Sequence, residues 1–283
     1  MSRPRGIPRS LGSAVLLVVA IAVSLLFLLP VLWLLASTFR TASETFASSS
    51  PLSWSVLWPR QLTVENLASA VRSGFLTALA NSLFVAVVTV IVGLAISAAA
   101  AFALAIIPFR GRSAIFTVVV LSFLVPFEAI AIPLSRMFSE WNLTNTLLAL
   151  ILPGLGNGLA VFTLRQFFLG IPSSLAEAAH LDGANWFRIF WSVYLPLTRP
   201  ALIGAGLILF LFQWQAYLWP ILVTSRQELD LAPVAIAKAF GAFTTDYGRV
   251  FAETAILALI PAIVLLALQR YFVTSVASTG SKE

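Results

Sequence analysis

The residues with the most chemical character lie in one short polar stretch of a very apolar chain. Its sequence is Glu177-Ala178-Ala179-His180-Leu181-Asp182-Gly183-Ala184, followed by Tyr194-Leu195-Pro196-Leu197. Ser174 and Glu177 have the spacing of a helix capping box, and Gly183 is placed to end that helix. A second short helix is predicted from Asn185. The pattern predicts a helix–glycine–helix elbow on a membrane surface, and an ordinary surface helix between two spans is the alternative interpretation.

The chain offers no set of residues suited to catalysis or metal binding. It has no cysteine and one histidine, His180, which excludes thiolate nucleophiles and multi-histidine metal sites. Neither lysine lies in a phosphate-binding glycine loop, so we expect no ATP hydrolysis by this chain. An integral membrane enzyme, which stays open as an alternative class, would need a nucleophile, a base or metal ligands clustered at the interface, and one histidine with no cysteine argues against it.

Composition indicates that lipid is the solvent for most of the surface. The chain has 283 residues, of which 60% are hydrophobic and 10% are charged, whereas soluble domains carry about 25% charged residues. The net charge of +6 does not indicate nucleic-acid binding, because the basic residues are scattered singly at the ends of apolar runs.

The apolar runs predict an all-α, polytopic membrane protein with six transmembrane helices. About 20 residues per run suffice for a hydrocarbon core of about 30 Å. No internal repeat supports an inverted-repeat secondary transporter. The predicted spans are 11–36, 78–106, 114–133, 147–168, 201–223 and 251–273, between a segment 1–10 and a tail 274–283.

Basic residues predict the orientation and small residues predict one packed face. Arg3, Arg5 and Arg9 precede the first span, which favours a cytoplasmic N-terminus. Six spans then place the C-terminal tail and the elbow, 172–196, in the cytoplasm, and the connections 37–76 and 224–249 outside. The alanine-rich stretch 95–105 of the second span is expected to pack against another helix rather than lipid.

The polar stretch resembles the cytoplasmic EAA loop of ABC importer permeases. Glu177-Ala178-Ala179, Asp182-Gly183-Ala184 and Leu195-Pro196 stand in the order and spacing of that loop. The wider chain resembles the six-span permease of maltose-type sugar importers, with the type I importer fold. The further matching motifs are Asn81-Ser82-Leu83, Ile132-Pro133-Leu134, Leu164-Arg165-Gln166-Phe167-Phe168, Leu218-Trp219-Pro220 and Tyr271-Phe272-Val273.

This resemblance implies a set of partners and a docking site. In that family the elbow sits in a cleft of a separate ATPase, so ATP and Mg would bind to the partner and no cofactor to this chain. The assembly would contain a second permease, two ATPase subunits and an extracytoplasmic binding protein, in the plasma membrane of a prokaryote. The residues implied for ATPase coupling are Glu177, Ala178, Ala179, Leu181, Asp182, Gly183 and Ala184. For Leu181 and the pair Trp186–Phe187, a packing role is favoured over recognition of the partner.

Polar and aromatic groups at membrane depth are candidates for the substrate path. Amides and aromatic rings suit a carbohydrate, and glycerol phosphate stays open as an alternative substrate. Glutamines in spans also hydrogen-bond neighbouring helices, which is an equally good interpretation. An ion-coupled carrier would need titratable groups near the midplane, where only Glu128 is available. The candidates are Gln213, Trp214, Gln215, Tyr217, Glu128 and Asn157.

Overall fold

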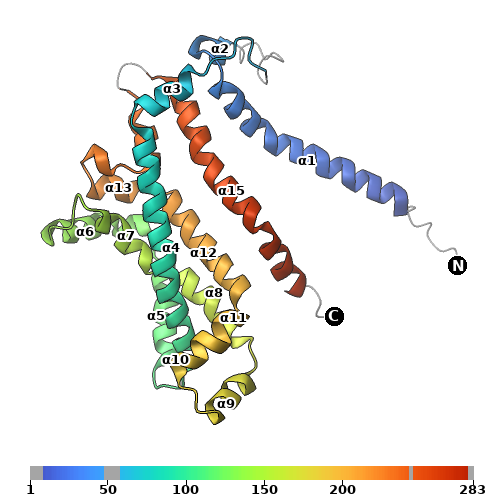
Figure 1. The fold of residues 1–283 in the computed structure, drawn as a ribbon, viewed down its shortest axis with the longest axis vertical. Helices are drawn as coiled ribbons and strands as arrows, with labels where there is room; N and C mark the ends of the chain where they lie inside the picture. The colour runs from blue at the N-terminus through green and yellow to red at the C-terminus, as the bar shows by residue number, and fades with distance from the viewer. Residues whose placement is uncertain (1–8, 48–57, 242–244, 280–283) are drawn as a thin grey trace. The chain divides into compact units, whose positions relative to one another are not determined.

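Almost all of the described chain is helical (Figure 1). The computed structural model describes residues 9–47, 58–241 and 245–279, and within them extended backbone pairs at an isolated bridge, Phe240 to Thr245. The all-α prediction is confirmed. Arg3 and Arg5 of the N-terminal segment, and the last four residues of the tail, lie outside the described residues.

The chain divides into two compact units, residues 1–74 with 239–256 and residues 75–238 with 257–283. In the first unit, helix α1 (Arg9–Thr38) covers the first predicted span, and none of its most apolar window is buried. The predicted polar connection 37–76 contains two short helices, α2 (Ala42–Ala47) and α3 (Glu65–Arg72).

Buried polar groups join the elements of the first unit. Asn66 Nδ2 donates to the carbonyl oxygen of Thr38 at 2.9 Å. Glu253, in α15 (Tyr247–Thr279), is fully buried and accepts from Arg249 Nε at 2.7 Å and from Ser73 Oγ at 3.0 Å. A buried carboxylate is stable only when it is paired, so these bonds fix the start of α15 beside the end of α3. Helix α15 also continues through most of the predicted tail.

Helix α4 (Phe75–Ala105) is the central element of the second unit and covers the second predicted span. It packs along α7 (Leu147–Leu155), α8 (Gly158–Leu169) and α12 (Arg199–Trp214). Ala98 and Ala101 are buried in the same apolar cluster as residues of α8 and α12. The prediction that the alanine-rich half of this span packs against protein is therefore confirmed.

Two predicted spans are wrong as single helices. The span 114–133 is split into α5 (Arg112–Leu124) and α6 (Phe127–Glu140), which meet at 97°. Val125, ahead of Pro126, is extended because a residue before proline avoids the helical region. The span 201–223 is split into α12 and α13 (Leu218–Val223). Pro220 explains this break, since its ring would clash with the carbonyl of Ala216 in a continuous helix.

The fourth predicted span, 147–168, is also interrupted, and the interruptions lie together. Gly156 and Asn157 separate α7 from α8, although the two pieces together form one 23-residue candidate span. A Cβ on Gly158 would lie 2.9 Å from Phe123 Cβ, at the end of α5, and a Cβ on Gly154 would lie 2.7 Å from Gln213 Oε1, at the end of α12. We call the three interruptions, 125–126, 156–157 and 215–217, the break layer.

The break layer lies inside the membrane-spanning region. Helices α5, α8 and α12 have 13, 12 and 16 residues between their elbow-side ends and the layer. At 1.5 Å per residue these helices are about 20, 18 and 24 Å long, compared with a hydrocarbon core of about 30 Å. By length and composition, four helices of the described chain can cross a membrane, or up to six if two bent pairs, α5 with α6 and Trp186–Leu197 with α12, are each counted as one span.

Candidate functional site

The elbow is a compact turn between two helical segments. Helix α9 (Ser173–Leu181) is followed by α10 (Trp186–Ile189), the π-helix η2 (Phe190–Tyr194) and α11 (Leu195–Leu197). Gly183 has φ of +81°, as predicted for the stop. Its N–H donates to His180 O and the N–H of Ala184 to Ala179 O, both at 2.9 Å. These two bonds form a Schellman motif, which needs a residue without Cβ strain at Gly183.

The predicted capping box is wrong. Helix α9 has Pro172 as its N-cap and no side-chain cap, so Ser174 lies inside the first turn. Proline presets the backbone angle that leads into a helix and makes an earlier start possible. Asn185 does cap the second segment, where its Oδ1 accepts from Arg188 N at 2.9 Å. The exposed Glu177 is consequently not used for capping, and its carboxylate makes no hydrogen bond within the described residues.

One face of the elbow presents apolar side chains to the surroundings. Leu181 is 90% exposed and Phe187 is 71% exposed. Within the described residues the packing expectation is therefore wrong for Leu181, whereas the ring of Phe187 lies 6.2 Å from that of Trp191, between centroids. Trp186 does pack, with its ring centroid 4.1 Å from that of His180. The other residues implied for coupling differ in their exposure. Two of them, Ala179 and Ala184, are half-buried. The exposed ones are Glu177, Ala178, Asp182 and Gly183.

The opposite face of the elbow is held to the membrane helices by an aromatic cluster. The ring of Phe102, near the end of α4, lies 5.1 Å from those of Phe190 and Tyr194 and 6.4 Å from that of Trp186, between centroids. Phe168 of α8 contacts Tyr194 at 5.8 Å. We call these five residues the elbow cluster. This cluster cannot be seen in the sequence, because its members come from three separate segments.

The six substrate-path candidates do not form one site. Gln213 and Trp214 are buried, and Trp214 stacks on Phe210 at 5.4 Å. Asn157 caps α8 by accepting from Ala160 N at 2.9 Å. Gln215, Tyr217 and Glu128 are instead exposed and lie at the break layer, the first two between α12 and α13 and the third in the first turn of α6.

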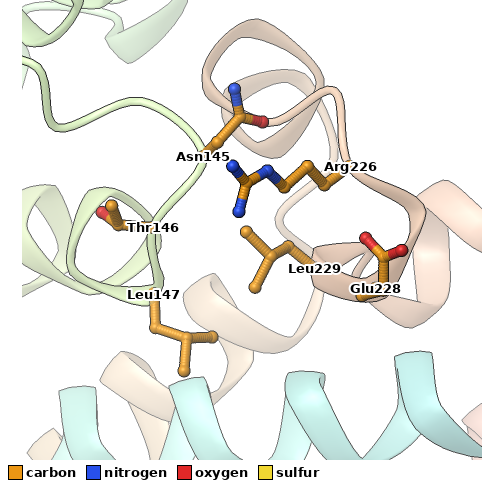
Figure 2. Close-up of a pocket in the computed structure, with 6 residues that line it drawn as sticks. All are labelled: Asn145, Thr146, Leu147, Arg226, Glu228 and Leu229. Atoms are coloured by element: carbon orange, nitrogen blue, oxygen red, sulfur yellow. The ribbon is translucent and has the colours of Figure 1, made fainter.

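A pocket of about 640 Å³ lies at the opposite end of the second unit from the elbow. Figure 2 shows Asn145, Thr146 and Leu147 on one side of it and Arg226, Glu228 and Leu229 on the other. Asn81 of α4 donates to the carbonyl oxygen of Glu228 at 2.7 Å. Asn81 and Phe102 are 21 residues apart on one helix, which corresponds to about 32 Å. The attachments of the pocket and of the elbow to α4 are therefore separated by about the thickness of a hydrocarbon core, which is about 30 Å.

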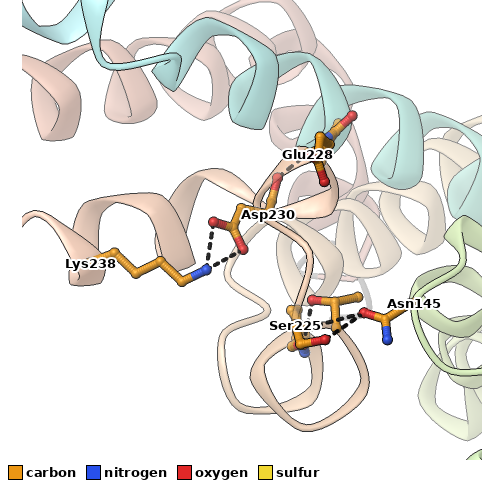
Figure 3. A network of polar contacts seen from close by, with 8 residues as sticks. Asn145, Ser225, Glu228, Asp230 and Lys238 are labelled. Carbon is orange, nitrogen blue, oxygen red and sulfur yellow. Dashed lines mark hydrogen bonds and ion pairs between the residues drawn. The ribbon is translucent and has the colours of Figure 1, made fainter.

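The wall of the pocket is held by polar contacts (Figure 3). Asn145 Oδ1 accepts from Ser225 N at 2.7 Å and from its Oγ at 3.1 Å. Lys238 Nζ lies 2.7 Å from both carboxylate oxygens of Asp230, which is nearly fully buried. Ser82 Oγ accepts from Ala232 N at 2.8 Å. The polar pair Asn81-Ser82 at the start of an apolar run was the sequence signal for this attachment. We call residues 224–238 the anchored segment.

The described residues contain no group of three or more His, Cys, Asp or Glu side chains that could hold a metal ion. The second unit carries an exposed elbow at one end of α4 and a pocket with hydrogen-bonded walls at the other.

Comparison with known proteins identifies similar sequences. The family described as "Binding-protein-dependent transport system inner membrane component" matches residues 91–278. The arabinooligosaccharides transport system permease protein AraQ of Halalkalibacterium halodurans is 30% identical over 256 residues, covering 89% of this chain and 90% of that protein. The sn-glycerol-3-phosphate transport system permease protein UgpE of Rhizobium meliloti is 32% identical over 252 residues, covering 83% and 89%.

A solved structure has the same fold. It is a bacterial ABC transporter involved in the import of the acidic polysaccharide alginate, and one of its chains superimposes with a TM-score of 0.79 at 22% sequence identity. The match covers 95% of this chain and all of the other. The type I importer permease fold predicted from the sequence is confirmed by this match.

Proposed function

Since this chain belongs to the family of inner membrane components of binding-protein-dependent transport systems, we propose that it couples solute import to a separate ATPase through the elbow. The observation that carries the proposal is the two-sided elbow. Its outer side presents the carboxylate of Glu177 beside exposed Leu181 and Phe187. Its inner side is fixed to α4 and α8 by the elbow cluster. Such a part can bind a partner and transmit its movement.

The partner ATPase supplies the energy. Glu177 would pair with a basic group of that subunit, while the exposed apolar side chains fill its cleft. Aromatic and apolar side chains in the middle of an interface commonly carry most of the binding energy. ATP and Mg bind to the ATPase in this proposal, and this chain contributes no catalytic residue. The elbow then faces the cytoplasm.

The remaining proposed partners are a second permease and a protein that binds at the face opposite to the elbow. A second permease completes the membrane path, and an extracytoplasmic binding protein delivers solute at the face that carries the pocket. The hydrogen-bonded walls of the pocket favour this role, because a surface that is held in place loses little entropy on binding. The relatives give no support to an ion-coupled carrier without an ATPase.

The solute is proposed to be a carbohydrate. Relatives are named for arabinooligosaccharides and for sn-glycerol-3-phosphate. The exposed side chains at the break layer, Gln215, Tyr217 and Glu128, are an amide, a phenol and a carboxylate. Amide and phenol groups suit hydroxyl-rich solutes, and a carboxylate repels a phosphate, so the neutral carbohydrate is favoured.

Affinity purification from the native membrane tests the proposal. A tagged chain should bring down an ATPase, a second permease and a binding protein. Glu177→Arg should lose the ATPase and keep the second permease. Glu140→Arg, which changes another exposed carboxylate outside the elbow, should lose nothing. A chain that purifies alone, or a Glu177→Arg variant that retains the ATPase, would overturn the proposal.

A further inference from the structure

Unpaired polar side chains stand at membrane depth in the break layer. Gln215 is exposed, Tyr217 is 46% exposed, and Glu128 is exposed in the first turn of α6. No side chain or backbone group of the described residues pairs with any of these three side chains. The backbone also departs from the regular helical hydrogen-bond pattern there, because Val125 N donates to Ser122 O at 3.4 Å and Ala216 N donates to Gln213 O at 3.3 Å.

The rings near the break layer bring its parts together. Phe127, beside Glu128, meets Trp219 of α13 with 5.8 Å between ring centroids. Trp219 is buried, and its Nε1 donates to the carbonyl oxygen of Ala149 in α7 at 2.8 Å. The first turns of α6 and α13 are thus neighbours, and Glu128, Gln215 and Tyr217 all flank this junction.

Lipid is an unsuitable environment for these groups. Irregular backbone at membrane depth is tolerated only where it is buried in protein or lines a water-filled cavity. A carboxylate at that depth is costly unless it faces water or a partner. The other three candidates differ, because Gln213, Trp214 and Asn157 are buried or used as a cap. Exposure therefore separates the six candidates into a packing group and an uncovered group.

We propose, on the basis of the importer function above, that Gln215, Tyr217 and Glu128 line the aqueous solute path of this subunit. Gln213, Trp214 and Asn157 support the path from behind. An amide can both donate to and accept from hydroxyl groups, a phenol ring stacks on a sugar face, and a carboxylate accepts hydrogen bonds while repelling anions. The path therefore selects uncharged, polyhydroxylated solutes over anionic ones.

Thiol accessibility tests the path, because the chain has no cysteine of its own. Gln215→Cys, Tyr217→Cys and Glu128→Cys would be made singly in the full complex in native membranes. A membrane-impermeant charged maleimide would be added, and its attachment to this chain measured over time. The maleimide reacts with the thiolate form of cysteine. Apolar surroundings raise the pKa of a thiol and so lower the fraction of thiolate, and each unit of increase in that pKa slows labelling about tenfold. We expect all three positions to label at least about tenfold faster than a position in lipid.

Two matched positions serve as controls. Phe212→Cys replaces an apolar side chain that is 63% exposed on α12, one turn before the break. Gln213→Cys is its buried neighbour. Both should label slowly. The inference is overturned if any of the three proposed positions labels no faster than Phe212→Cys, since lipid or the second permease then covers it. Equally fast labelling of the controls would overturn it as well.

A second measurement tests the solute class. Two thiosulfonate reagents of matched size, one cationic and one anionic, would be compared at Gln215→Cys. The cationic reagent should react several-fold faster, and adding Glu128→Gln should remove this preference. A faster anionic reagent, or a preference unaffected by Glu128→Gln, would refute selection by the carboxylate. The readout of these measurements is thiol labelling of this chain and not retention of the ATPase, so their failure is distinguishable from loss of the ATPase in the purification experiment.

Discussion

The attachment of the elbow to α4 can be weakened at a single side chain. Phe102 meets three aromatic rings of the elbow and the ring of Phe168. Aromatic pairs contribute about 0.5–1.5 kcal/mol each beyond their buried area. Phe102→Leu retains an apolar side chain and removes the ring contacts. Since such contributions are not additive, we expect a loss of about 2 kcal/mol in the free energy that keeps the elbow closed.

Hydrogen exchange measures this loss directly. The amides of Gly183, Ala184 and Arg188 are hydrogen-bonded within the elbow and exchange when it opens. A loss of 2 kcal/mol corresponds to about 30-fold faster exchange. Peptides from 173–197 would be followed by mass spectrometry, with peptides from the anchored segment as an internal reference that should not change.

A matched variant at the other end makes the test specific. Phe138 is also buried, and its ring lies 5.1 Å from that of Trp219, next to the anchored segment. Phe138→Leu should accelerate exchange there and leave the elbow unchanged. If Phe102→Leu leaves elbow exchange at the wild-type rate, or if both variants accelerate both regions equally, the elbow cluster is not the local attachment that its geometry indicates.

Three further changes have defined outcomes. Gly158→Ala places a Cβ 2.9 Å from both Phe123 Cβ and the carbonyl oxygen of Val119, so it should lower the free energy of unfolding by about 1–3 kcal/mol. A lower thermal unfolding temperature should show this loss. Gly156→Ala is the control, because a Cβ there meets nothing within 4 Å and should avoid this packing cost. In Gly183→Ala the new Cβ meets no other atom, but the alanine must adopt φ of +81°, which costs about 1–2 kcal/mol of backbone strain. Hydrogen exchange of the elbow amides should therefore become faster, while the overall unfolding temperature stays nearly constant. Lys238→Ala leaves a nearly buried carboxylate without its ion pair, so proteolysis of the anchored segment should accelerate, and Lys238→Arg should restore resistance; unchanged proteolysis in Lys238→Ala would contradict the anchoring role.

Local patterns in the sequence were sufficient to predict much of the fold. Helix α4 follows from one uninterrupted apolar run, and the glycine stop at Gly183 follows from a requirement that few other residues meet. The buried alanines of α4 follow from their small size. Each of these features is decided by residues close together in the chain, which is why the sequence was sufficient.

The bends and attachments depend on contacts that the sequence does not display. Hydropathy is the same whether a run is straight or turns by 97° at Pro126, so the third span was predicted as one helix. The start of α9 is set by Pro172 rather than by Ser174, because proline offers a start that competes with a side-chain cap. The elbow cluster joins residues from α4, α8 and the elbow, and only the folded chain places them together.

Helix α4 is one uninterrupted helix of 31 residues with an attachment near each end. Phe102 joins it to the elbow, and Asn81 joins it to the anchored segment. A tilt of about 5° around its middle would move these two points, about 32 Å apart, by about 1.4 Å each in opposite directions. A partner that favours one tilt at the pocket therefore changes the affinity of an elbow partner that also distinguishes the two tilts, and thermodynamic linkage makes the reverse effect equal in size.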